Sequence, residues 1–180
     1  NLIAGIDLAT ISGDFDQGAG QELLGKFRAA HSSSALAANC FAPFKRHPES
    51  LALPYGTGFA TVQFERKCPH GLRGTPPNLD LLAESPTSVV GIESKCLEPL
   101  SPHHARFSSA YDAGITDGRR TTPWFAEMQR LVADPVRYRW LDAAQLVKHA
   151  FGLAHCFTDR PVVLFYLFWE PTNPQTHPIF

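Results

Sequence analysis

Hydrophobic and polar positions in the first third of the chain follow two different periods. In residues 21–44 apolar side chains recur at the spacing of one helical face, which predicts one long or broken helix that Pro43 interrupts. In residues 59–68 apolar and polar side chains alternate, which predicts a strand with one buried face. Residues 1–20 are rich in glycine and small side chains, so we expect them to be mostly irregular.

The middle of the chain predicts a β-hairpin. Residues 78–95 read NLDLLAESPTSVVGIESK, two runs of apolar and β-branched residues separated by turn-forming residues from Ser85 to Ser88. Side chains alternate across a strand, so Glu93 and Lys95 share one face of the second run. If the two runs pair, Asp80 approaches Glu93 and Lys95.

The second half of the chain predicts two helices and a last strand. Helical spacing covers Trp124–Val132 and Asp142–Ala154, the latter with Asp142 as its N-cap. The continuous apolar run Val162–Trp169 has the length of a strand, which predicts a buried strand. Residues 99–123 have the proline, serine and glycine content of a loop, one long enough to be functional or mobile.

Composition and charge favour one soluble, globular domain. The chain has 180 residues, of which 44% are hydrophobic and 18% charged, so we expect a single domain over residues 1–180 with residues 171–180 as a tail. No apolar window approaches the roughly 18 residues of a membrane span, and the start lacks the regions of a signal peptide. Four widely separated cysteines favour a reducing, cytoplasmic location. With a net charge of -1, any nucleic-acid contact must come from local patches.

Asp80, Glu93 and Lys95 carry the candidate chemistry of the chain. Two carboxylates form an oxygen-rich site for a hard divalent cation, and the ammonium can meet a phosphate or orient a water molecule. A second acidic-x-Lys triplet, residues 65–67, also falls on a predicted strand but lacks an aspartate on the strand before it. The plain alternative is a cross-strand ion pair at a sheet surface. We favour the metal site, because the strand around Glu93 reads as buried on both faces and a buried charge needs a reason.

These residues resemble the PD-(D/E)xK, or restriction-endonuclease-like, nuclease superfamily. Pro76–Asp80 is similar to its loop-strand-Asp segment, and Gly91–Lys95 is similar to its apolar strand that ends in Glu-x-Lys. The resemblance covers roughly residues 20–170. It implies an α/β fold with an αβββαβ core, in which helices flank a central mixed β-sheet.

The resemblance also implies an activity. Members are metal-dependent hydrolases in which the two acidic residues, here Asp80 and Glu93, bind Mg²⁺, and the lysine, here Lys95, positions or activates the attacking water. Mn²⁺ is the alternative ion. The implied partner is nucleic acid, with DNA favoured over RNA, and the sequence does not fix the oligomeric state.

Further residues are implied around this centre. Many members carry another acidic residue on the first helix, for which Glu22 is the candidate and Glu65 the competitor. Some members have Gln-x-x-x-Tyr on a later helix. Gln145 has this spacing to His149, which stands in the place of the tyrosine. A polar rim beside the site and plain solvent exposure are the two interpretations of this pair.

The remaining candidate site residues are two arginines and two possible zinc ligands. Arg119 and Arg120 lie near Trp124, as a clamp on a nucleic-acid backbone beside a stacking ring would, and a solvated loop is the plain alternative. Cys68 and His70 supply only two of the four ligands of a zinc site, with no second pair at a suitable spacing.

Two functions from different classes follow. The first is a Mg²⁺-dependent nuclease whose site contains Asp80, Glu93 and Lys95. The second is a catalytically inactive module that keeps the nuclease fold for binding nucleic acid or protein.

Overall fold

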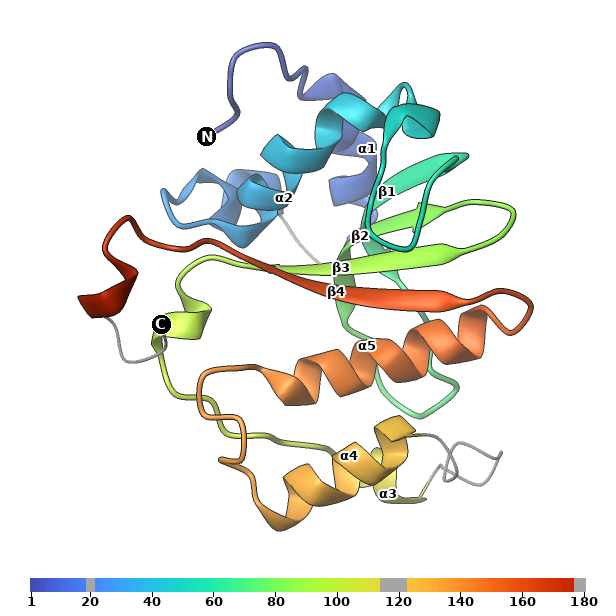
Figure 1. Cartoon of the computed structure of the whole chain (residues 1–180), viewed down its shortest axis with the longest axis vertical. Helices are drawn as coiled ribbons and strands as arrows, with labels where there is room; N and C mark the ends of the chain where they lie inside the picture. The colour runs from blue at the N-terminus through green and yellow to red at the C-terminus, as the bar shows by residue number, and fades with distance from the viewer. Residues whose placement is uncertain (19–21, 114–122, 177–180) are drawn as a thin grey trace.

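The core of the fold is a four-stranded mixed β-sheet with helices on both faces (Figure 1). The computed structural model describes residues 1–18, 22–113 and 123–176. The strands are β1 (Thr61–Lys67), β2 (Asn78–Glu84), β3 (Val89–Lys95) and β4 (Val162–Phe168), in the spatial order β1-β2-β3-β4. The first three strands are antiparallel, and β4 is parallel to β3. This architecture confirms the predicted α/β class and its mixed sheet.

The β2–β3 hairpin is present as predicted. The hydroxyl of Ser85 accepts hydrogen bonds from the backbone N–H groups of Thr87 and Ser88, which closes the turn between the strands. The β2–β3 register runs from Glu84 opposite Val89 to Leu81 opposite Ile92, and Asp80 and Glu93 follow directly at the end of the hairpin away from the turn.

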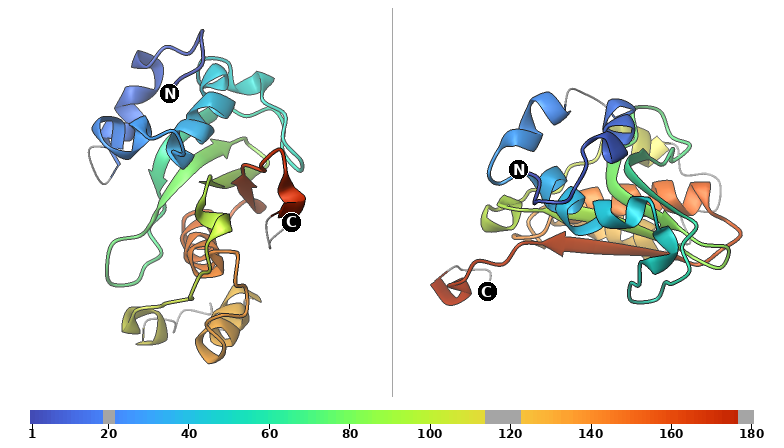
Figure 2. Two further views of the ribbon diagram at one scale, coloured as in Figure 1. Left: turned by 90° about the vertical axis from the view of Figure 1, so that its left-hand side faces the viewer. Right: turned by 90° about the horizontal axis from the view of Figure 1, so that it is seen from above.

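The described residues form five α-helices, which lie in layers on the two sides of the sheet (Figure 1). They are α1 (Ala9–Asp16), α2 (Ser33–Phe41), α3 (Ser109–Ala113), α4 (Pro123–Ala133) and α5 (Ala143–Cys156). Helices α1 and α2 lie on one face of the sheet, whereas α5 lies on the other with α3 and α4 beyond it (Figures 1 and 2). Each residue of β3 is buried, because the strand lies inside the sheet between these two layers. The predicted burial of both faces around Glu93 is thereby confirmed.

Apolar side chains fill both interfaces. On the α1 and α2 face, Ile11 and Phe15 pack with Phe64 and Ile92 in the largest core cluster. On the other face, Leu153 of α5 packs in a smaller cluster with residues of β2 and β3. A third cluster joins α4 to α5. These contacts hold the open end of β3 between α2 and the beginning of α5.

The prediction for the first 20 residues was wrong, because α1 occupies Ala9–Asp16. Its sequence, ATISGDFD, has little helical pattern. Its two buried residues, Ile11 and Phe15, are four positions apart and face the core. Tertiary packing of this pair, rather than intrinsic helix propensity, therefore explains the helix.

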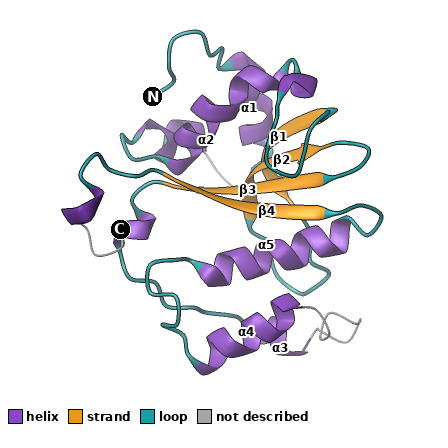
Figure 3. Cartoon of the chain, viewed as in Figure 1, coloured by secondary structure: helices purple, strands orange, loops and turns teal. Residues whose placement is uncertain are grey.

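The predicted helix over residues 21–44 is broken in the structure (Figure 3). Two short 3-10 turns, Glu22–Leu24 and Lys26–Arg28, precede α2. Ser32 begins α2 as its N-cap, because its side chain accepts a hydrogen bond of 3.1 Å from the backbone N–H of Ala35. The serines of this segment therefore mark the start of a helix.

The later helices agree with the predictions, and Asp142 is the N-cap of α5, where it accepts the N–H of Gln145 at 3.1 Å. The predicted loop over residues 99–123 contains α3 in its described part. The prediction that β4 is buried was wrong: it is an edge strand of half-buried residues that ends at the exposed Phe168. None of the described helices is long and apolar enough to cross a membrane.

Candidate active site

A cavity of about 560 Å³ lies where β3 ends, between α2 and the first turn of α5. It brings together five residues that the sequence predicted for one site: Glu22, Asp80, Glu93, Lys95 and Gln145. Glu65, the competitor of Glu22, lines the same cavity. The two remaining predicted residues, Arg119 and Arg120, lie outside the described residues.

The side chains of Glu93 and Lys95, at the end of β3, point toward α5. The Lys95 ammonium is 2.5 Å from Glu93 Oε1 and also donates to Gln145 Oε1 at 2.9 Å. On the other side of the carboxylate, His149 Nε2 lies 2.8 Å from Glu93 Oε2. Gln145 lines the cavity, whereas His149 is buried and contacts Glu93 from behind it, so this helical face is not simply exposed to solvent.

Asp80 completes the pair of carboxylates. The β2–β3 ladder ends at Leu81 and Ile92, and beyond it the backbone N–H of Ser94 donates to Asp80 Oδ2 at 2.6 Å. Although the residue keeps some exposure, protein atoms surround its carboxylate. Desolvation and the nearby charge of Glu93 raise the pKa of Asp80 well above its usual value, and the Ser94 hydrogen bond only partly opposes them.

The side chains next to Glu93 lower the pKa of its carboxyl group rather than raise it. Burial alone would raise the pKa of Glu93, but His149 and Lys95 lower it below the usual value, so this carboxylate is ionised at neutral pH. Burial alone would lower the pKa of Lys95, yet the Glu93 carboxylate raises it, so the lysine keeps its positive charge. The site thus contains one well-compensated carboxylate, Glu93, beside one poorly compensated carboxylate, Asp80.

Glu22 and Glu65 approach the cavity from different elements. Glu22 Oε1 accepts a hydrogen bond from Ser34 Oγ at 3.1 Å, and Glu65 Oε2 accepts one from Asn78 Nδ2 at 3.0 Å. Burial raises the pKa of Glu65, and the charges of Glu22 and Glu93 add to this rise. Glu65 also has a φ of +49°, a left-handed conformation that is strained for a residue with a side chain. Both candidates for the further acidic residue are thus in place.

Two charged residues of the cavity were not singled out from the sequence. Glu98 follows β3 and accepts the backbone N–H of Cys96 at 2.8 Å, and Lys26 lies on a 3-10 turn before α2. The position of Glu98, three residues after Lys95, was a signal that could have identified it. No local pattern distinguishes Lys26 from the other lysines.

The donor set fits a hard divalent cation held mainly by two carboxylates. Asp80 and Glu93 lie on the adjacent strands β2 and β3, and both carboxylates line the same cavity. Mg²⁺ keeps several waters and commonly needs only one or two carboxylates. No group of three His, Cys, Asp or Glu side chains in the described ranges is arranged to hold a metal ion, so a cation there would depend on the two carboxylates and water.

The antiparallel hairpin, the parallel β4 and the flanking helices together define a restriction-endonuclease-like fold, with paired carboxylates and a lysine at the open end of its hairpin. The model of the family described as Restriction Endonuclease associating with ARP matches residues 10–180, and the chain belongs to this family. Membership indicates a nuclease-like function at the level of the family. No curated protein and no solved structure matches the chain significantly.

Proposed function

We propose that the chain is a Mg²⁺-dependent phosphodiester hydrolase that cleaves nucleic acid, with DNA as the favoured substrate. The observation that carries the proposal is the single cavity in which Asp80, Glu93 and Lys95 meet, with Glu22 and Glu65 at its wall. The family adds support, because its description names restriction endonucleases. Mn²⁺ is the alternative ion, since it also accepts carboxylate and water ligands.

Each residue has a distinct task in this proposal. Asp80 and Glu93 would hold the cation, which supplies Lewis-acid stabilisation of phosphate charge and lowers the pKa of water. Lys95 keeps its positive charge beside Glu93 and is therefore suited to attract the phosphate or to orient the attacking water. Gln145 fixes the ammonium by accepting its hydrogen bond at 2.9 Å. His149 holds the second oxygen of Glu93 from the α5 side.

Cleavage of labelled DNA in Mg²⁺ and in EDTA tests the proposal. We expect the wild-type chain to cleave only with the ion, and Asp80→Asn and Lys95→Met to lose at least about 100-fold in rate, the scale on which one preorganised charge at the reacting centre acts. Lys67→Met is the matched control, because Lys67 ends the rival triplet on a neighbouring strand and does not line the cavity. Cleavage by both site variants at the wild-type rate would refute the assignment.

Glu22→Gln and Glu65→Gln address the further acidic residue. The variant that removes the catalytically relevant carboxylate should slow cleavage, and the other should leave the rate close to that of the wild-type chain. Both residues line the same cavity, so a difference between the two cleavage rates shows which carboxylate takes part in the reaction rather than which one merely lies near the site.

A non-catalytic binding module is the second candidate function. The observation that favours it is that Lys95 and His149 both contact the Glu93 carboxylate. These contacts offset its negative charge without a bound metal ion. The family description also names an association with ARP, and a protein partner of that kind would suit a module. A module should bind its target equally in EDTA and show no turnover in Mg²⁺.

A further inference from the structure

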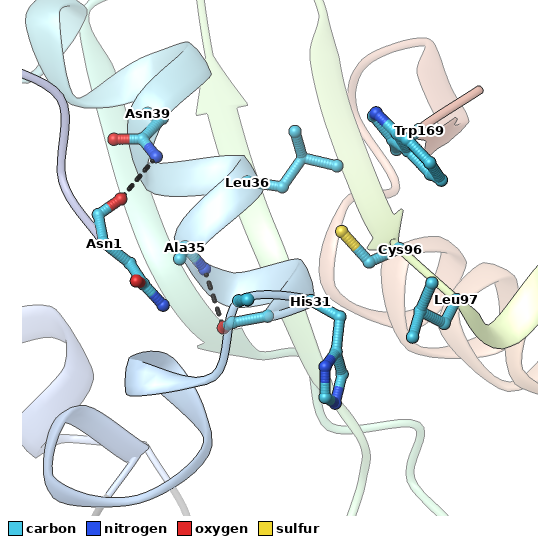
Figure 4. A pocket seen from close by; sticks show the side chains of 10 residues that line it. Asn1, His31, Ala35, Leu36, Asn39, Cys96, Leu97 and Trp169 are labelled. Carbon is cyan, nitrogen blue, oxygen red and sulfur yellow. Dashed lines mark hydrogen bonds between the residues drawn. The ribbon is translucent and has the colours of Figure 1, made fainter. Parts of the chain in front are cut away.

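A second cavity, of about 330 Å³, adjoins the candidate active site. The two share His31, Ser32 and Leu97 in their walls, so they lie side by side. Figure 4 shows this second cavity between α2, which contributes Leu36, and the chain that follows β3 and β4. A polymer bound across the candidate site would therefore meet this second cavity next.

The two cavities differ in chemistry. The active-site cavity contains five carboxylates, those of Glu22, Glu65, Asp80, Glu93 and Glu98. None of the described side chains that line the second cavity carries a carboxylate, and its wall combines the apolar Leu36 and Leu97 with the imidazole of His31. Such a surface suits a flat, largely apolar group with hydrogen-bonding edges rather than a phosphate.

Trp169 gives the second cavity a stacking surface. The residue is 44% exposed, and no aromatic or cation-π contact within the described residues covers its ring. Its backbone N–H donates to the carbonyl oxygen of Lys95 at 3.2 Å, which joins the residue directly to the strand that contains the candidate catalytic lysine. The backbone of Trp169 is thereby joined to β3 beside the active site.

We propose that this cavity receives an unpaired nucleobase, one next to the phosphate that is cleaved, stacked on Trp169. The inference rests on the proposed function and deepens it, because it names single-stranded or locally unpaired nucleic acid as the substrate class. A base inside a duplex is stacked on its neighbours and cannot enter such a recess, whereas an unpaired base stacks on an aromatic side chain without sequence preference.

Binding measured in EDTA separates this inference from cleavage. Fluorescence anisotropy would compare a labelled single-stranded oligonucleotide, its duplex, and a set of single strands with one abasic position each. We expect the wild-type chain to prefer the intact single strand and to lose about 5- to 150-fold in affinity at one abasic position, the effect of losing one stacked base. Trp169→Ala should lose a similar factor and show no further loss at that position, while Trp169→Phe should recover most of the affinity.

Tyr55→Ala is the matched control. Tyr55 is an aromatic residue with 83% exposure, and it lies in the loop near Val90 at the other end of β3. Its removal should leave both affinity and the abasic profile unchanged. Thermal melting by circular dichroism would confirm that each variant remains folded, as expected for exposed side chains.

The outcomes distinguish the two proposals. Equal affinity of Trp169→Ala and the wild-type chain, or an abasic effect that persists in Trp169→Ala, would overturn the base site even if Mg²⁺-dependent cleavage is observed. Binding of single strands that depends on Trp169, without any cleavage in Mg²⁺, would support the base site and refute the proposal that the chain is a hydrolase. If the wild-type chain binds no oligonucleotide of either kind in EDTA, the base site is refuted, whereas the hydrolase is judged separately by cleavage in Mg²⁺.

Discussion

Replacing Asp80 by asparagine should make the metal-free protein more stable while removing the proposed hydrolase activity. Burial and the nearby charge of Glu93 raise the pKa of Asp80 well above its usual value. Asparagine has nearly the same shape, and its carbonyl oxygen can still accept the N–H of Ser94 that now donates to Asp80. The substitution therefore removes the repulsion and keeps the hydrogen bond.

Coulomb's law sets the magnitude. Two unit charges about 5 Å apart repel by about 3 kcal/mol at an effective permittivity of about 20. The Lys95 ammonium attracts Asp80 and offsets part of this repulsion. We therefore expect Asp80→Asn to raise the free energy of unfolding by about 1–2 kcal/mol at pH 7.

Urea unfolding followed by circular dichroism in EDTA measures this gain. The folded-state pKa of Asp80 lies above its unfolded value, so the penalty is complete above the folded pKa and absent below the unfolded one. The advantage of asparagine should accordingly shrink as the pH falls toward about 4. Saturating Mg²⁺ should stabilise the wild-type chain, by about 2.7 kcal/mol at 100 times its dissociation constant, and should reverse the order of the two proteins.

Asp16→Asn is the control, because Asp16 is exposed on α1 and its replacement should change stability by no more than about 0.5 kcal/mol. A lower stability of Asp80→Asn in EDTA at pH 7 would refute the reasoning, since it would mean that the Asp80 charge is compensated within the protein. A gain that persists unchanged in Mg²⁺ would instead count against cation binding at Asp80.

Three further predictions concern the scaffold around the site. Asp142→Ala should lower the free energy of unfolding by about 1 kcal/mol, because it removes the cap on the N–H of Gln145, whereas Asp142→Asn should keep most of it. Gly152→Ala should destabilise the protein by about 1–3 kcal/mol in the same urea assay, because a Cβ there would lie 2.4 Å from the carbonyl oxygen of Cys68. Burial, aided by Cys156, raises the pKa of the Cys68 thiol to about 12, so alkylation at pH 8 mapped by mass spectrometry should modify the exposed Cys40 and spare Cys68. Equal labelling of these two cysteines would contradict the last prediction.

The sequence was sufficient for the hairpin, because all of its determinants are local. The alternation of apolar residues, the turn around Ser85 and the side-chain period of two together predict that Glu93 and Lys95 share a face and that Asp80 lies near them, as the common cavity shows. These are relations within 18 neighbouring residues of the chain, from Asn78 to Lys95. Local patterns of this kind also identified the Asp142 cap of α5.

The errors concern relations between distant segments. Helix α1 forms because Ile11 and Phe15 pack against residues of strands far along the chain, which a short pattern cannot reveal. The apolar run of β4 predicted burial, but composition does not show whether a strand lies inside a sheet or at its edge. The choice between Glu22 and Glu65 depended in the same way on tertiary structure, which brings both to one cavity.

The charge of the candidate site indicates how a phosphate could approach it. Five carboxylates and two ammonium groups line the cavity, a formal excess of three negative charges when all are ionised, in a chain whose net charge is only -1. An anionic backbone meets repulsion there unless a cation is bound first, so we expect the ion to precede the nucleic acid. The adjoining cavity beside Trp169 lacks carboxylates among its described lining residues and does not impose this order on a base. Affinity for an oligonucleotide in EDTA should therefore come mainly from the base, and Mg²⁺ should add the contribution of the phosphate.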